Sequence, residues 1–201
     1  MLKLYGNAMS RAFRPLWMLE ELGVPYEQIT VNFATGETRK PEYLAINPNG
    51  HVPTLVDGDT IIWESMAINF YLAKKYDEGL QPKSLADEGR AIMWSFWAMT
   101  EVEAHVLKVL MNRVILAKEQ RNSAEADEAE KKLAAPLAVL DGALQGKRYL
   151  LGDNFTVADL NVASVLSWAR ASKMDLAKYP NLGRWLGECL SRPAVKRAQG
   201  K

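Results

Sequence analysis

The sequence contains little cysteine and no excess of either charge. Cys189 is the single cysteine among 201 residues, which excludes an internal disulfide framework or multi-cysteine metal cluster and suits a reducing compartment. The 25 basic and 24 acidic residues nearly cancel, so neither nucleic acid nor an anionic membrane is an expected partner. No uncharged stretch reaches the roughly 18 residues of a membrane span, and the N-terminus shows no signal-peptide run. We therefore expect a soluble, cytoplasmic protein without a metal site.

The first part of the chain carries strand and helix patterns in turn. With 48% hydrophobic residues, the chain can bury the core of one large domain or two small ones. The elements expected here are a strand at Leu2–Tyr5, a helix ending at Gly23, a strand at Tyr26–Phe33, a helical turn within 40–46, strands at Val52–Val56 and Thr60–Trp63, and a helix at Ser65–Tyr76. This order predicts a mixed four-stranded sheet covered by helices.

After residue 77 the strand signals largely vanish. Helical spacing of apolar residues predicts a long helix over 92–114 and another over 126–144, where Pro136 would kink or restart the chain. Thr156 and Asp159 form a helix-start signature, and a last helix covers 182–190. The predicted domains are an α/β domain at 1–77, a linker at 78–86 and an all-α helical bundle at 87–201.

Five separated motifs carry a likeness to a known family. They are Ser-Arg-Ala-Phe-Arg…Leu-Glu-Glu-Leu-Gly at 10–23, Asn-Pro-Asn-Gly-His-Val-Pro-Thr-Leu at 47–55, Trp-Glu-Ser at 63–65, Phe-Thr-Val-Ala-Asp at 155–159, and Pro-Asn-Leu…Trp…Arg-Pro-Ala-Val at 180–195. In this order and spacing they make the sequence resemble the cytosolic glutathione transferases, bacterial-type and serine-type, over essentially its whole length. The resemblance implies a thioredoxin-like N-terminal domain, a helical C-terminal domain and glutathione between them as co-substrate. It also implies a detoxification role and a homodimer, with helices 65–76 and 88–115 at the interface.

The resemblance assigns glutathione contacts to two motifs. In the family, the proline matching Pro53 follows a cis bond, which turns the backbone N–H and C=O of Val52 toward the cysteinyl backbone of glutathione. Glu64 pairs with the γ-glutamyl ammonium, while the hydroxyl and N–H of Ser65, at a helix start, bind the γ-glutamyl carboxylate. The alternatives are a structural edge proline at Pro53 and a plain helix cap at Ser65.

Two further residues are candidates for the glycyl carboxylate of glutathione. His51 stands where family members often place a basic or amide side chain, and the alternative is a solvated loop histidine. Lys40, just before Pro41, is a second candidate, and a plain surface lysine is the alternative.

Ser10 is the predicted catalytic residue. An unperturbed thiol has a pKa of about 8.5, so lowering it by about two units, or about 2.7 kcal/mol, makes the thiolate dominant. A hydroxyl aimed at the sulfur, with a helix N-terminus behind it, can provide this stabilisation. Ser10 lies four residues before Arg14, as the catalytic serine does in serine-type members, and Arg14 either raises the local potential or holds a structural ion pair. Asn7 is a second catalytic candidate, which could supply another donor. A plain helix N-cap at Ser10 and a catalytic Tyr5 remain alternatives.

The second substrate is expected to be a small apolar electrophile. Its candidate pocket residues, chosen by position, are Met9, Phe96, Met99, Thr100 and Glu103. The function predicted is glutathione transfer. The rivals are a glutathione-dependent disulfide or hydroperoxide reductase, because a stabilised thiolate also attacks S–S and O–O bonds, and a non-catalytic binding module on the same fold.

Overall fold

The computed structural model describes residues 1–32, 35–76 and 78–200. The elements are β1 (Leu2–Tyr5), α1 (Phe13–Leu22), β2 (Tyr26–Ile29), the 3₁₀ turn η2 (Glu37–Arg39), α2 (Pro41–Leu44), β3 (Thr54–Asp57), β4 (Thr60–Trp63), α3 (Ser65–Tyr76), α4 (Leu85–Trp97), the π-helical turn η3 (Ala98–Val102), α5 (Glu103–Leu110), the π-helical turn η4 (Met111–Ile115), the 3₁₀ turn η5 (Lys118–Gln120), α6 (Ser123–Ala143), α7 (Val157–Ala171), α8 (Pro180–Leu190) and α9 (Pro193–Gln199).

The chain forms two compact units. Unit 1 contains Met1–Gln81 and the residues from Arg192 onward, and unit 2 contains Pro82–Ser191. The sequence placed 192–201 in the helical domain. The structure instead groups the described part of this segment with unit 1, because α9 packs on α1. The first helix of unit 2, α4, begins at Leu85 with Ser84 as its N-cap, slightly before the predicted domain start at 87.

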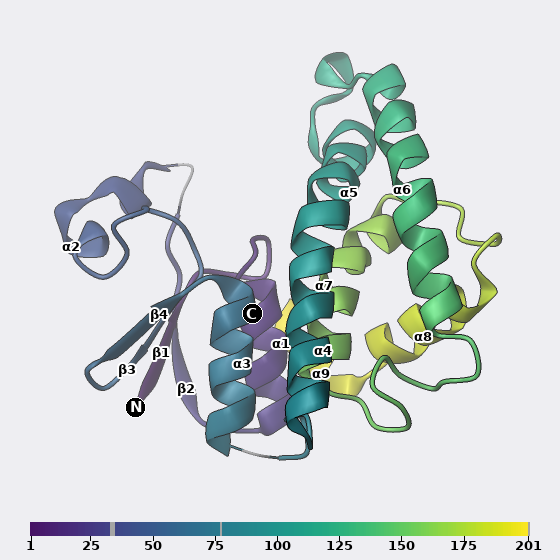
Figure 1. Cartoon of the computed structure of the whole chain (residues 1–201). Helices are drawn as coiled ribbons and strands as arrows, with labels where there is room; N and C mark the ends of the chain where they lie inside the picture. The colour runs from purple at the N-terminus through teal and green to yellow at the C-terminus, as the bar shows by residue number, and fades with distance from the viewer. Residues whose placement is uncertain (33–34, 77, 201) are drawn as a thin grey trace. The chain divides into compact units, whose positions relative to one another are not determined.

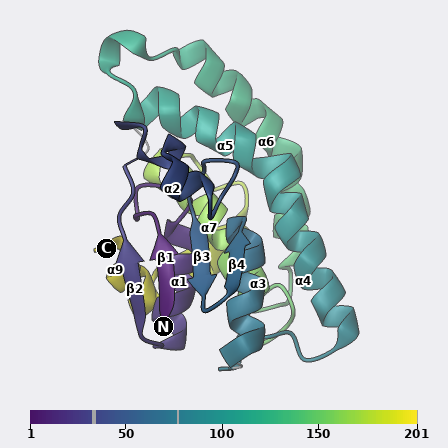
Figure 2. The same ribbon diagram turned by 90° about the vertical axis from the view of Figure 1, so that its left-hand side faces the viewer.

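Unit 1 is built on a mixed four-stranded sheet, as predicted. Its strand order is β2-β1-β3-β4, with β1 and β2 parallel and the other neighbours antiparallel. Figure 2 looks onto this sheet, and Figure 1 shows α1 and α3 together on one face of it. The side chains of Leu4 and Leu55 are fully buried, as are those of Leu16 in α1 and Ile68 in α3. The core of unit 1 therefore lies between the sheet and these two helices.

Two of the strands, β2 and β3, are shorter than the sequence predicted, while β1 and β4 have the predicted bounds. β3 begins at Thr54 rather than Val52, because Pro53 cannot donate a ladder hydrogen bond. β2 ends at Ile29, and the predicted end at Phe33 lies outside the described residues. The predicted hairpin is confirmed: Asp57 pairs with Thr60. Its two-residue loop contains Gly58 at φ +60°, a conformation that glycine adopts without steric cost.

The C-terminal helix α9 is tied to α1 by charged contacts. Arg192 donates two hydrogen bonds to the carboxylate of Glu21, at 2.6 and 2.8 Å, and Trp17 Nε1 donates to the same side chain. Arg197 contacts Glu20, which also accepts from the Tyr26 hydroxyl. Proximity in the fold, rather than in sequence, thus makes α9 part of unit 1.

Unit 2 contains helices only, apart from its turns and one isolated bridge. α4, η3, α5 and η4 follow one another directly, where the sequence predicted one uninterrupted helix over 92–114. α5 packs against α6 and α7, and α7 also packs against α4 and α8. α6 neither stops nor restarts at Pro136, because Leu133, Leu137 and Leu140 stay buried on one face and tertiary packing outweighs the proline penalty. No described helix is both long and apolar enough to traverse a bilayer.

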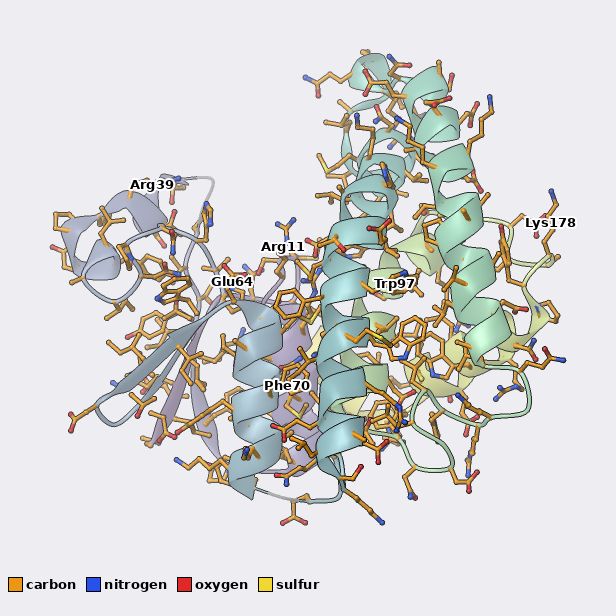
Figure 3. The ribbon with its side chains drawn as sticks, in the orientation of Figure 1. Arg11, Arg39, Glu64, Phe70, Trp97 and Lys178 are labelled. Atoms are coloured by element: carbon orange, nitrogen blue, oxygen red, sulfur yellow. The ribbon has the colours of Figure 1, made fainter. Side chains whose placement is uncertain are left out.

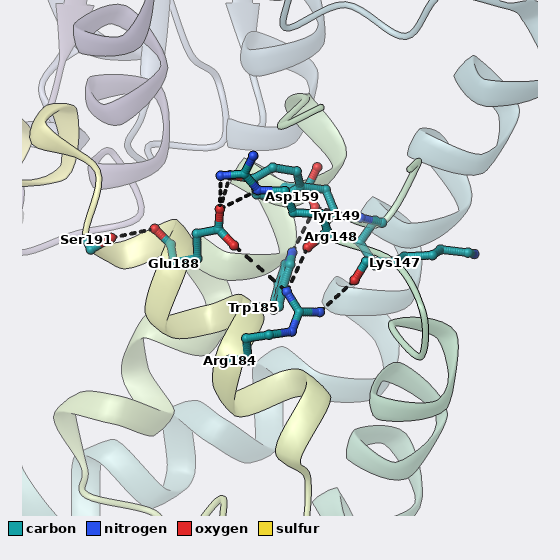
Figure 4. Close-up of polar contacts among 9 residues, drawn as sticks. Lys147, Arg148, Tyr149, Asp159, Arg184, Trp185, Glu188 and Ser191 are labelled. Carbon is teal, nitrogen blue, oxygen red and sulfur yellow. Dashed lines mark hydrogen bonds and ion pairs between the residues drawn. The ribbon is translucent and has the colours of Figure 1, made fainter. Parts of the chain in front are cut away.

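The buried carboxylate of Asp159 organises the start of α7. It accepts hydrogen bonds from the backbone N–H of Leu150 and Thr156, at 2.8 and 3.0 Å. It also accepts from Trp185 Nε1 at 2.8 Å (Figure 4). The predicted capping box of Thr156 and Asp159 is present. Burial raises the pKa of the Asp159 carboxyl, while these donors oppose the rise. A second cluster joins the exposed Arg148 and the buried Tyr149 to the half-buried Glu188 of α8 in the same view.

Candidate functional site

Three loops of unit 1 meet at one end of the sheet. Tyr5, the last residue of β1, pairs with Thr54, the first of β3, and Thr54 pairs with Trp63, the last of β4. The β1–α1 loop, the segment before β3 and the β4–α3 junction therefore emerge side by side. The glutathione and thiol residues predicted from the sequence belong to these loops, except Lys40.

Gly6 brings the first two loops into contact. A Cβ atom on Gly6 would lie 2.5 Å from Ala12 Cβ, 3.3 Å from Val52 Cβ and 3.6 Å from Ser10 Oγ. Gly6 also has φ +125°, which side chains rarely adopt. Only glycine fits this position, and its small size lets Ser10 approach Val52.

The Ser10 hydroxyl holds the turn that precedes α1. Its Oγ donates to the carbonyl of Asn7 at 2.8 Å and accepts from the backbone N–H of Ala12 at 3.1 Å. α1 itself begins at Phe13, and its N-cap is Ala12. Ser10 is therefore not the N-cap, although its side chain does satisfy one backbone donor just before the helix. The Asn7 side chain closes the same turn, because its Oδ1 accepts from Met9 N–H at 3.1 Å.

The main chain of Val52 has no hydrogen-bond partner among the described residues. The Val52–Pro53 bond is cis, as the resemblance implied. Within the described residues, neither the N–H nor the C=O of Val52 forms a hydrogen bond. Because paired main-chain groups are the rule in folded proteins, this pair is a ready partner for an extended peptide.

Glu64 and Ser65 join β4 to α3. Glu64 is exposed at φ +73°, in the left-handed region that costs a non-glycine residue roughly 1–2 kcal/mol. Figure 3 shows Glu64 at the start of α3, at the same end of unit 1 as Arg11 and Arg39. Ser65 is buried and is the first residue of α3, so the helix N-terminus adds free N–H groups and positive potential. This junction can therefore bind a ligand that carries an ammonium, which Glu64 can pair with, beside a carboxylate, which the N-terminus of α3 can bind.

Arg14 lies beneath this junction. It is 1% exposed, and its Nη1 donates to Ser65 Oγ at 3.1 Å. The Ser65 oxygen thus accepts from a guanidinium, which leaves the Ser65 hydroxyl hydrogen for a ligand. This contact brings a positive charge to the start of α3, and both roles that the sequence left open for Arg14 stay predictions.

Three basic residues, Arg39, Lys40 and His51, belong to the turn before Val52 or to the segment whose Arg39 contacts it. His51 and Lys40 are both exposed, as a carboxylate-binding or merely solvated side chain would be. Sequence reasoning missed Arg39, whose Nη1 donates to the carbonyl of Asn49 at 3.2 Å. A Cβ on Gly50 would lie only 2.8 Å from that nitrogen. The signal in the sequence is the adjacent basic pair at 39–40, which includes Lys40.

The predicted second-substrate residues are split between the units. Met9, in unit 1, is 83% exposed, and Phe96, in unit 2, is 67% exposed. Thr100 is exposed, Met99 is half-buried, and Glu103 is buried at 3% exposure. Their assembly into one pocket stays a prediction.

Neither a metal site nor a second ligand site is indicated among the described residues. No group of three or more His, Cys, Asp or Glu side chains is arranged to hold a metal ion there. An open groove of about 300 Å³ lies between α5 and α6, lined by His105, Lys108, Glu125, Glu128 and Lys132 among others. The lysine and glutamate charges cancel, so the groove has no clear preference for a charged ligand.

Two family models match this chain, one in its N-terminal part and one in its C-terminal part. The family model of the glutathione S-transferase N-terminal domain matches residues 1–74, and that of the C-terminal domain matches residues 98–193. The glutathione S-transferase GstB of Escherichia coli is 35% identical over 98% of this chain and 97% of its own.

Solved structures give the same result. The theta class glutathione S-transferase of Xanthomonas axonopodis pv. citri, with glutathione bound, is 31% identical with a TM-score of 0.92, covering 100% of this chain and 97% of its own. A glutathione transferase of Burkholderia graminis, with two glutathione molecules bound per subunit, is 27% identical with a TM-score of 0.86, covering 100% of this chain and 88% of its own.

Proposed function

This chain belongs to the glutathione S-transferase family, and we propose that it binds glutathione at the three loops of unit 1 and uses Ser10 to activate the thiol. The observation that carries this proposal is the strand register from Tyr5 through Thr54 to Trp63. In this register the loop of Ser10, the main chain of Val52 and the N-terminus of α3 lie at one end of the sheet, and within the described part of the chain the Val52 main chain has no partner. The activated thiol would attack a small apolar electrophile.

Each part of the tripeptide has a matching group. The main chain of Val52 pairs with the cysteinyl backbone, Glu64 with the γ-glutamyl ammonium, and Ser65 with the γ-glutamyl carboxylate. The buried guanidinium behind Ser65 and the N-terminus of α3 favour that negative charge. Arg39, with Lys40 and His51, would hold the glycyl carboxylate.

The chemistry needs a redirected hydrogen bond. In the structure the Ser10 hydroxyl hydrogen is donated to Asn7 O, and rotation about the Cβ–Oγ bond would aim it at the glutathione sulfur. Donation to the thiolate favours the ionised form and lowers the thiol pKa. The proton of the thiol passes to solvent water. In substitution the thiolate forms a C–S bond while the leaving group departs with the electron pair of the bond that breaks. In conjugate addition the thiolate forms a C–S bond, and the resulting carbanion takes up a proton from water.

Replacement of Ser10 by Ala tests the proposal. If the bound thiol returns to its ordinary pKa, turnover near pH 6.5 should fall by about 50-fold, while the dissociation constant for glutathione stays within a few-fold. Steady-state assays with a chloronitroaromatic substrate measure the first quantity, and calorimetric titration measures the second. The control is Ser123→Ala, because Ser123 is an exposed serine at the start of α6. Unchanged turnover in Ser10→Ala would transfer the role to Asn7, Tyr5 or a backbone N–H.

A glutathione-dependent disulfide or hydroperoxide reductase is the second candidate function. It is favoured by the Burkholderia graminis relative, whose structure holds two glutathione molecules per subunit. Parallel assays with the chloronitroaromatic and with hydroxyethyl disulfide separate the two reactions. A non-catalytic module is the third reading. If the protein binds glutathione but is inactive in both assays, the non-catalytic reading is favoured.

We also propose that the enzyme is a cytoplasmic homodimer that detoxifies electrophiles. The single cysteine fits a reducing compartment. Exposed apolar side chains support a dimer, among them Trp63 beside α3 and Ile92 and Met93 on α4, which are 41%, 40% and 52% exposed. Analytical ultracentrifugation should give about twice the chain mass of 22.5 kDa, and Met93→Glu should lower it toward that of one chain.

A further inference from the structure

We propose that Tyr43 is a positioning residue for glutathione, and that its hydroxyl fixes the direction of the Val52 N–H. This inference rests on the proposed binding of glutathione to the Val52 main chain. Tyr43 belongs to α2, is 6% exposed, and donates to the carbonyl oxygen of His51 at 2.6 Å. It does not touch the reacting sulfur in this scheme, so its effect is on binding geometry.

The planar peptide group between His51 and Val52 links the direction of the His51 carbonyl to that of the Val52 N–H. The C=O of His51 and the N–H of Val52 belong to one peptide unit, which is trans, since the cis bond is the following one. In a trans unit these two groups point in opposite directions. Holding the His51 oxygen toward α2 therefore directs the Val52 N–H away from α2.

The His51 oxygen is held on two sides. Asn47 Nδ2 donates to it at 2.8 Å, in addition to the Tyr43 hydroxyl, so both lone pairs of the carbonyl have donors. The same hydroxyl and the same amide each lie 3.0 Å from Thr54 Oγ1. Tyr43 is 6% exposed and Asn47 is 1% exposed, so water cannot readily replace either of these donors to the His51 oxygen. Thr54 is fully buried as well.

The side chain of Tyr43 is itself fixed. Its ring lies edge-on against Tyr5 of β1, with centroids 5.9 Å apart. Burial raises the pKa of the Tyr43 hydroxyl, and a protonated hydroxyl is the form that can donate to His51. The peptide plane before Val52 is thus braced against both α2 and the sheet before any ligand arrives.

The test is Tyr43→Phe, which removes the hydroxyl and keeps the ring. We expect the dissociation constant for glutathione to rise about 5- to 10-fold, as for loss of one hydrogen bond to a preorganised site, with kcat within about 2-fold. The matched control is Tyr71→Phe, because the Tyr71 hydroxyl donates to Asp57 at the same 2.6 Å distance but lies away from Val52. It should leave glutathione affinity within about 2-fold.

A spectroscopic measurement separates this inference from the proposed function. The ¹⁵N–¹H signal of Val52 should shift when wild-type protein is saturated with glutathione, and the shift should shrink in Tyr43→Phe. No shift in the wild type would refute the proposed Val52 contact itself. A full shift and unchanged affinity in Tyr43→Phe would overturn the positioning role alone.

Asn47→Ala provides a second variant on the same carbonyl oxygen. It should raise the glutathione dissociation constant at least as much as Tyr43→Phe, with kcat again nearly unchanged. If both variants bind glutathione as wild type does, or if Tyr71→Phe loses as much affinity as Tyr43→Phe, the inference is wrong.

Discussion

The two units use buried and strained groups for opposite purposes. In unit 2 the carboxylate of Asp159 is fully buried and surrounded by donors from the loop before α7 and from α8. In unit 1 the main chain of Val52 has no partner among the described residues, and Glu64 has a positive φ. Asp159 therefore finds its hydrogen-bond donors within unit 2, whereas the main chain of Val52 is available to a ligand.

This difference separates stability from binding. A group whose partners are all within the protein contributes to folding, and its loss leaves buried donors unsatisfied. A group held ready for a ligand contributes nothing to folding and can even cost stability. Substitutions in the two units should therefore affect different measurements.

The largest effect is expected for Asp159→Ala. It leaves the N–H groups of Leu150 and Thr156 and the indole N–H of Trp185 without their acceptor, at about 1–3 kcal/mol for each buried donor. The free energy of unfolding should fall by about 3 kcal/mol or more, measured by urea unfolding followed through tryptophan fluorescence. Asp153→Ala is the control, because Asp153 is exposed.

In the same experiment, Asp159→Ala protein that remains folded at low temperature should bind glutathione with unchanged affinity. A stability loss no larger than that of Asp153→Ala would contradict the account of unit 2.

Glu64→Asn should give the reverse result. Asparagine tolerates the left-handed region better than glutamate, so unfolding free energy should stay equal or rise by up to about 1 kcal/mol. Glutathione affinity should fall by about 10-fold or more, because a charge-assisted hydrogen bond is lost. Calorimetry and urea unfolding measure the two quantities.

Lys173→Asn is the matched control for this prediction. Lys173 is the other described non-glycine residue with a positive φ, at +54°, and it lies in unit 2. Its substitution should change stability in the same direction and leave glutathione affinity unaltered. Loss of affinity in both variants, or in neither, would remove the distinction between the units.

The smallest effect is expected at the cluster of Glu188 with Arg148 and Tyr149. The hydrogen bond from Arg148, with that from Tyr149, lowers the pKa of the Glu188 carboxyl. A lowered pKa stabilises the fold above the unfolded-state value of about 4.3, and this contribution is lost as pH falls through the folded-state value. Glu188→Gln should therefore cost at most about 1 kcal/mol at neutral pH, since the Arg148 side chain is 62% exposed.

The difference between Glu188→Gln and wild type should shrink when urea unfolding is repeated below about pH 4.3. A difference that stays constant or grows with acid would contradict the assigned charge state.

Local signals predicted much of the fold. β1 and α3 have the predicted bounds, and the capping box of Thr156 and Asp159 could be read from four consecutive residues. These features depend on neighbours in sequence. The membership of α9 in unit 1 could not be read this way, because it depends on Arg192 meeting Glu21 across most of the chain.

The candidate site was predicted through the resemblance rather than through periodicity. The motifs named Ser10, Val52, Glu64 and Ser65, and the strand register explains how their loops lie together. Tyr43 was missed because its contact with the His51 carbonyl follows from the path of α2 over the sheet. A tyrosine in a short helix gives no such signal in the sequence.

The most direct test of the central claim is the pKa of the thiol of bound glutathione. It can be measured in the wild-type complex by following thiolate absorbance in the ultraviolet as pH is raised. We predict a titration midpoint at a pH of about 6.5, which is about two units below the ordinary thiol pKa of about 8.5. A midpoint that stays near about 8.5 with the site saturated would contradict thiol activation by the loops of unit 1.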